Sequence, residues 1–401
     1  MTEAKRVLDR GVGTDLQRVS ILFGLCSATT LLARMQTAFE LAQQIIEVSE
    51  RQDDPIHRLV AYRMLGTNQF FAGRHREALA NLQNGKRYRD PHRQRALSYR
   101  FGWDPSLAIL SFEGLTRLSL GQLDSAARIG EQVRAEVSNH GHAATVASAT
   151  FCVTTWPELV LGDLDGLERD SSELAAYCVE KKVEQIRLLA SFHCAFARAM
   201  RDPSGDNIAA QRAALDEVRS AGGNVGNSLN ICNLVEVALM AGDWKCAEAD
   251  LADGFAFVEQ SGEQYWLADL HRLSGQLALR RPMPDRSRAE ACFTKAIGVA
   301  RGQHARLLEL RAATDLARLW RDTRPDNDIH ALLQPILAAI EGGETARDVR
   351  SARSLLDGQD QEIPAVCQSA PRAICIANIN PRLHNGSEIF DQTAGNNSRT
   401  P

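Results

Sequence analysis

The sequence predicts an all-α fold, a right-handed superhelical solenoid of about seven to eight tetratricopeptide-like helical hairpins. Two patterns point to this class: a glycine recurs at intervals of about forty residues, and apolar residues recur at helical spacing. In addition, no segment shows the alternation of a strand bounded by hairpin turns. We expect an N-terminal lead-in over 1–15, the solenoid over 16–357 and a disordered tail over 358–401.

The recurring glycine is followed five residues later by a small or apolar residue. Most of these glycines end an apolar run and begin a short polar link, where glycine adopts the left-handed conformation at little cost. A small residue at the second position lets the next helix approach the first closely. Each unit therefore predicts one helix-turn-helix hairpin. The pairs are Gly73 with Ala78, Gly121 with Ala126, Gly162 with Leu167, Gly205 with Ala210 and Gly242 with Ala247, and the glycines are 48, 41, 43 and 37 residues apart.

Three further units fit the hairpin pattern more loosely, over Leu16–Glu50, Asp269–Gly302 and Leu307–Ile340. The segment "AEACFTKAI" has the alanine and phenylalanine spacing of a tetratricopeptide repeat. After Asp357 the helical pattern stops, and the chain becomes rich in Pro, Asn, Ser and Gly. Such a composition buries too little apolar surface to fold, so we expect a disordered tail there.

Several unusual segments resemble the C-terminal helical region of large bacterial regulators: "RFGWDPS", "NHGHAATVASAT", "SGEQYW" and "AEACFTKAI". In that family the repeats follow a predicted ATPase domain fused to a class III adenylate/guanylate cyclase or to a winged-helix DNA-binding domain. The resemblance covers about Leu16–Asp357. The chain has no GxxxxGK[ST] phosphate loop, so the nucleotide chemistry of the family does not carry over. The resemblance implies a detached C-terminal repeat arm.

Composition excludes several classes of protein. The net charge of −4 lacks the basic balance of a duplex-binding domain, so nucleic acid is an unlikely partner. The charged N-terminus has no signal-peptide core, and no run of about 18 apolar residues predicts a membrane span. The nine cysteines are dispersed and form no CxxC pair. We therefore expect a reduced, cytoplasmic protein without membrane contact.

The patterns that would carry catalysis are weak. No GxSxG nucleophile elbow occurs. His140 and His142 lack a nearby third metal ligand, and we expect them to cap backbone groups in a link between helices. Glu259 and Glu263 are one helical turn apart, but Ser261-Gly262 interrupts the helix, which favours surface solvation. We expect no enzymatic activity, no cofactor and no metal.

The strongest charge feature is the basic, tyrosine-containing stretch "GKRYRDPHRQRALSYR", which precedes "RFGWDPS". Arginines with interleaved aromatics can bind an acidic protein or a nucleic-acid backbone. The alternative is a solvated link whose arginines pair with acids on neighbouring helices. "RFGWDPS" is either a packed loop before a helix start or an exposed aromatic anchor for a partner. The candidate partner-binding residues are Arg87, Arg89, Arg93, Arg95, Arg100, Trp103 and Asp104.

These observations predict a non-catalytic regulatory scaffold that binds a protein or peptide partner. Stacked hairpins form a curved surface whose lining residues contact a peptide or helix. The partner suggested by the resemblance is an ATPase- or cyclase-type regulator. The alternative is that the chain forms part of a cyclase-related or winged-helix transcriptional regulator and acts together with an ATPase domain.

Overall fold

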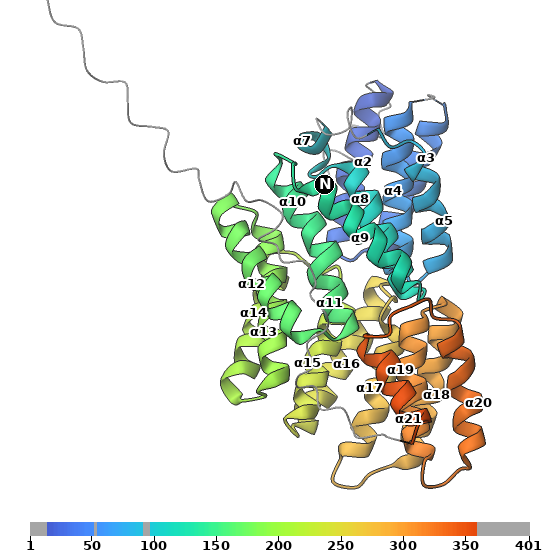
Figure 1. The fold of residues 1–401 in the computed structure, drawn as a ribbon. Coiled ribbons are helices and arrows are strands. Elements are labelled where there is room, and N and C mark those ends of the chain that lie inside the picture. The colour runs from blue at the N-terminus through green and yellow to red at the C-terminus, as the bar shows by residue number, and fades with distance from the viewer. Residues whose placement is uncertain (1–13, 52–53, 91–96, 359–401) are drawn as a thin grey trace, which may run out of the picture.

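The computed structural model describes residues 14–51, 54–90 and 97–358 (Figure 1). The described chain is all-α, and its helices pack as antiparallel hairpins, which confirms the predicted fold class. The predicted tail after Gly358 and nearly all of the predicted lead-in lie outside the described residues, so the predicted domain boundaries stay a prediction.

Eight hairpins follow one another in the described chain, and a short helix α7 (Ser98–Phe101) lies between the second and the third. The final helix, α21 (Arg347–Leu356), follows the last hairpin. The hairpins are α2 (Asp15–Leu31) with α3 (Met35–Arg51), α4 (Pro55–Phe71) with α5 (His75–Lys86), α8 (Pro105–Ser119) with α9 (Leu123–Val137), α10 (Ala143–Thr150), η2 (Phe151–Thr155) and α11 (Trp156–Leu161) with α12 (Leu164–Lys181), α13 (Glu184–Arg201) with α14 (Gly205–Ser220), α15 (Asn227–Met240) with α16 (Trp244–Ser261), α17 (Leu267–Arg280) with α18 (Arg286–Gln303), and α19 (Arg306–Trp320) with α20 (Asp326–Ala338).

Four of the five recurring glycines occupy the hairpin turns as predicted. Gly73, Gly121, Gly162 and Gly242 have φ angles from +73° to +78°, a conformation that glycine adopts without steric cost. Gly205 is different, because it is the first residue of α14 and does not have a positive φ angle. The sequence places Gly205 a few residues into its link; in the structure it directly follows that link, and the hairpin itself forms.

The hairpins stack in two tiers rather than as one open spiral. In Figure 1, α2–α5, α8 and α9 lie above α15–α21. The last carbonyl groups of a helix have no partner inside the helix. In the upper tier, Leu31 O accepts from Asn224 N at 2.9 Å, and Phe71 O accepts from Gln264 N at 2.9 Å. Links in the lower tier thus cap the ends of α2 and α4.

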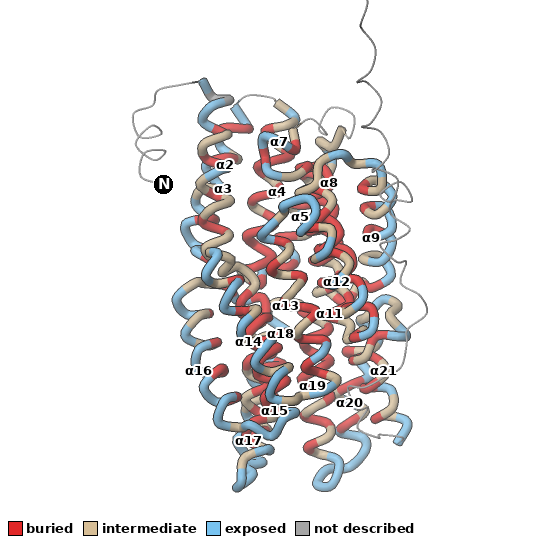
Figure 2. Tube along the Cα trace, turned by 90° about the vertical axis from the view of Figure 1, so that its left-hand side faces the viewer, coloured by how far each residue is buried: buried red, intermediate tan, exposed pale blue. Residues whose placement is uncertain are grey.

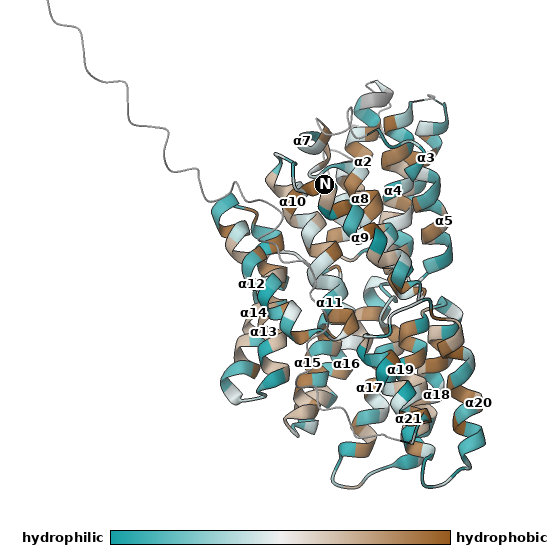
Figure 3. Cartoon of the chain, in the orientation of Figure 1, coloured by the Kyte–Doolittle hydropathy of each residue, from teal (hydrophilic) through white to brown (hydrophobic). Residues whose placement is uncertain are grey.

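Aromatic side chains fill the space where the two tiers meet. Phe70 and Phe71, at the end of α4, lie 5.4 Å from Tyr265 between ring centroids, and Trp156 lies 6.1 Å from Phe71. Tyr265 is 1% exposed, so this junction belongs to the core. Figure 2 shows buried positions along the inner sides of the helices, and Figure 3 shows hydrophobic residues on the same inward sides. Among the described residues, no helix is long and apolar enough to cross a membrane.

A single π-helical turn, η2, interrupts the first helix of the fourth hairpin. It ends at Thr155, two residues before Pro157, which has no N–H to donate to the Val153 carbonyl four residues earlier. Instead, Arg134 Nη1 donates to Val153 O at 3.2 Å. Such π-helical turns inside α-helices are frequent at functional sites.

Candidate binding groove

A groove of about 350 Å³ lies along the inner side of the lower tier. Its walls come from five helices, α13, α15, α17, α19 and α21, four of which are the first helices of successive hairpins. We call it the inner groove. Its lining residues are Met200, Glu236, Leu239, Met240, Arg272, Gln276, Arg280, Arg311, Thr314, Asp315, Arg318, Arg347, Asp348 and Ser351.

A network of buried ion pairs forms the floor of the inner groove. Arg272 Nε lies 2.5 Å from Asp269 Oδ1, and Arg272 Nη1 lies 3.1 Å from Asp315 Oδ2. Arg311 Nη2 lies 2.8 Å from Asp348 Oδ2 and also donates to Val160 O of α11 at 3.1 Å. Because a buried charge is costly unless it is paired, these contacts fix the relative positions of α17, α19 and α21.

The network keeps its carboxylates ionised. Burial alone would raise the pKa of Asp269, but the charges of Arg272 and Arg311 outweigh burial and lower it. The pKa of Asp348 is lowered in the same way, because Arg311 and Arg347 outweigh its burial. The aspartates and arginines on the floor of the groove are therefore charged and paired with one another at neutral pH.

The mouth of the groove is more open and has two kinds of chemistry. Met240, the last residue of α15, is 38% exposed and lines the groove with Met200 and Leu239. The exposed Arg280, the last residue of α17, donates from Nη1 to Gln276 Oε1 at 3.0 Å. Five arginines and three carboxylates line the groove, so its lining carries a net charge of +2 before Asp269 behind it is counted. A ligand with an apolar side chain and an acidic group fits this lining.

The described residues among those predicted from the sequence lie around the start of α8, at the opposite end of the molecule from α21 in Figure 1. Arg87 is exposed, whereas Arg89 donates to Ser106 Oγ at 2.7 Å and pairs with Glu136 at 2.6 Å. Arg100 donates to Ser20 Oγ at 3.2 Å. Arg93 and Arg95 lie outside the described residues.

Trp103 and Asp104 take part in packing and capping. Trp103 is half-buried, with its ring 5.2 Å from the Arg63 guanidinium and 6.4 Å from the Phe112 ring. Asp104 is 3% exposed, and its carboxylate accepts from Ser106 N at the start of α8, the helix start that the sequence predicts. His142 caps α10 through Thr145 N, as expected. The predicted partner-binding role of this region stays a prediction.

The inner groove itself was not predicted from the sequence. Charged residues on an otherwise apolar inner face were a signal for it, because they pair at the repeat interval. Gln276 contacts Asp315, which lies 39 residues later in the sequence, and Arg311 contacts Asp348, which lies 37 residues later. Glu263 was also missed: it is fully buried and accepts from Gly226 N and Ser228 N, where surface solvation was expected.

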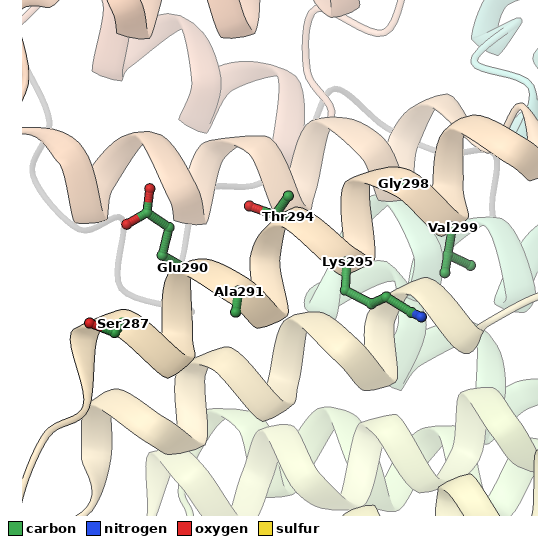
Figure 4. Close-up of a pocket in the computed structure, with 7 residues that line it drawn as sticks. All are labelled: Ser287, Glu290, Ala291, Thr294, Lys295, Gly298 and Val299. Carbon is green, nitrogen blue, oxygen red and sulfur yellow. The ribbon is translucent and has the colours of Figure 1, made fainter.

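A second hollow lies along the outer face of α18. All seven lining residues come from this one helix, among them Glu290, Thr294 and Lys295 (Figure 4). Glu290 is already engaged, because it accepts from Trp320 Nε1 at 2.8 Å. Since no second element supplies convergent polar groups, the inner groove is the stronger candidate.

No known protein family and no curated protein matches this sequence. Among solved structures, the chain is similar to a Rap protein crystallised in complex with competence and sporulation factor. The TM-score is 0.54 and the identity 12%, over 86% of this chain and 98% of the Rap chain. The chain is a tetratricopeptide-like helical repeat protein. At this identity the similarity shows the fold alone. Any ligand of this chain has to be inferred from the residues of its own groove.

Proposed function

We propose that this repeat protein is a regulatory scaffold that binds a peptide, or an extended segment of a protein, in the inner groove. The observation that carries the proposal is the groove's lining, which combines flexible methionines with arginines. The similar Rap structure, which was solved in complex with a factor, supports a binding role for this architecture. Recognition of this kind needs no covalent chemistry.

The proposal is tested with peptides selected from a display library on the purified chain. Their affinities are then measured by fluorescence anisotropy against the wild type and two groove variants, Met240→Ala and Arg280→Ala. We expect each variant to weaken binding by about tenfold, equivalent to about 1.4 kcal/mol. Both side chains are exposed, so unchanged helical content is expected and excludes misfolding as the cause.

Two matched controls and one competing site complete this experiment. Met283, which is 86% exposed, and Arg128, with a side chain 66% exposed, lie outside the groove. Met283→Ala and Arg128→Ala should leave affinity unchanged. Trp103→Ala tests the site predicted from the sequence. A loss of binding in this variant alone would move the proposed site from the inner groove to the start of α8.

A finer proposal concerns the partner's identity. The resemblance of the repeats to those of ATPase-linked regulators favours an ATPase- or cyclase-type polypeptide, in the reduced cytoplasmic setting expected from the cysteines. Cross-linking in cells followed by mass spectrometry tests it. Recovery of such a polypeptide on the inner groove would support the finer proposal, and consistent recovery of an unrelated partner would reject it while leaving the scaffold function intact.

A further inference from the structure

A cavity of about 660 Å³ lies between the upper tier and α21, separate from the inner groove. We call it the junction cavity. Its walls come from α8, α9, η2 and α11, and from the 342–350 segment that includes the start of α21. Leu118, Leu123 and Leu161 supply an apolar part. Its volume is within the range of about 300–1,000 Å³ that is common for small-molecule sites.

Two arginines line the junction cavity without a carboxylate partner. Arg134 donates to the Val153 carbonyl and forms no salt bridge with a described carboxylate, although the charges of Glu131, Glu158 and Asp170 act on it from a greater distance. Arg350 Nε is buried and has no hydrogen-bond partner among the described residues. Arginines that line the inner groove, such as Arg272 and Arg311, are paired with aspartates. Unpaired guanidinium groups beside a cavity indicate a site for an anion.

A third arginine adds positive charge behind η2. Arg63 is 7% exposed, and its Nε and Nη1 have no hydrogen-bond partner among the described residues. It interacts electrostatically with Cys152, which lines the cavity. Burial lowers the pKa of Arg63 to about 10, so it still carries its charge at neutral pH.

None of the acids that line the junction cavity forms a salt bridge with these arginines. Asp163 caps α12 through Gly166 N, and Glu344 pairs with Arg353. Burial, together with Asp170 beside it, raises the pKa of Glu158 to about 10, so its carboxyl group is neutral at pH 7. Asp124 lies in the first turn of α9, where the helix dipole already stabilises its charge.

Thr154 supplies an unused hydrogen-bonding group. It is a residue of η2, lines the cavity and is 5% exposed, and its hydroxyl has no partner among the described residues. We propose that the junction cavity binds a small organic acid, with its carboxylate held by Arg134, Arg350 and Thr154 and its apolar body against the leucines. This site is distinct from the proposed peptide groove and does not depend on it.

The probe for this site is octanoate, with octanamide and octylammonium as neutral and cationic analogues of the same length. Titration calorimetry on the full chain should give one saturable site for octanoate, binding about tenfold weaker for octanamide, and none for octylammonium. Equal or tighter binding of the amide or the ammonium ion would overturn the proposal, and so would the absence of saturable octanoate binding.

Variants place the site. Arg134→Gln and Arg350→Gln should each weaken octanoate binding by about tenfold, whereas Arg128→Gln on the exposed part of α9 should not. Thr154→Val is the most informative change. Because the hydroxyl has no partner in the free chain, this variant should unfold at the same or a higher temperature while binding octanoate more weakly. Unchanged octanoate affinity in Arg134→Gln and Thr154→Val would show that the acid does not bind in the junction cavity.

Discussion

At the scale of single residues, one proline organises the fourth hairpin. Pro157 has no N–H to donate to Val153 O, and η2 forms before this proline. Arg134 donates a hydrogen bond to the Val153 carbonyl instead. The next turn places the buried Glu158 beside Asp170, where burial and this neighbouring acid raise the pKa of Glu158. This is a local arrangement in which ionisation and folding are linked.

The first prediction concerns this acid pair. The folded chain holds the Glu158 proton up to a pKa of about 10, whereas the unfolded carboxyl group ionises near 4.5. Unfolding therefore releases a proton between these values, and Glu158 makes the chain less stable as the pH rises through this window. Glu158→Gln should gain stability relative to the wild type between about pH 5 and about pH 8.5 in urea unfolding. The exposed Glu131→Gln is the control, and a constant difference between Glu158→Gln and wild type would contradict the assignment.

At the scale of helices, close packing depends on small residues at the points where paired helices cross. A Cβ atom on Gly275 would lie 2.5 Å from Phe293 Cε1, and one on Gly66 would lie 2.6 Å from Leu82 Cγ. The sequence pattern placed four turn glycines correctly, because the steric demands of a tight turn act locally. Gly205, which the pattern places inside a link, directly follows that link, because Pro203 and Ser204 precede the start of α14.

The second prediction uses two glycines of the same hairpin. Gly275→Ala should destabilise the chain by about 1–3 kcal/mol, because Phe293 has to move. Gly298→Ala on the exposed face of α18 meets nothing within 4 Å and should stabilise it by about 0.5–1 kcal/mol. Chemical denaturation of both variants measures the contrast. Equal effects would mean that α17 and α18 do not approach as closely as described.

At the scale of the whole molecule, contacts between distant repeats turn a linear array into one body. Repeat number and helix order follow from sequence periodicity, but the two-tier stacking does not. Its contacts include backbone hydrogen bonds such as Tyr265 N to Phe71 O, which any residue could make, and they leave no sequence pattern. The inner groove depends on contacts between distant repeats, because Arg311 joins α19 to both α21 and α11.

The third prediction is that the two tiers unfold together. Leu82 is fully buried in the upper tier, and Leu82→Ala should cost about 2–5 kcal/mol. Hydrogen exchange should then accelerate in α17 of the lower tier as well as in α4, because the tiers share a core. A linear repeat array would confine the effect to neighbouring hairpins. Unchanged protection of α17 would therefore show that the tiers are independent.

The central claim is that a peptide lies in the inner groove, and the most direct measurement is where a bound peptide cross-links. A display-selected peptide carrying one photoreactive residue is irradiated on the full chain, and the adducts are located by mass spectrometry. The account predicts adducts on α15, α17 and α19, near Met240 and Arg280, and their loss when unlabelled peptide competes. Competable adducts confined to α7 and the start of α8, near Trp103, would contradict it.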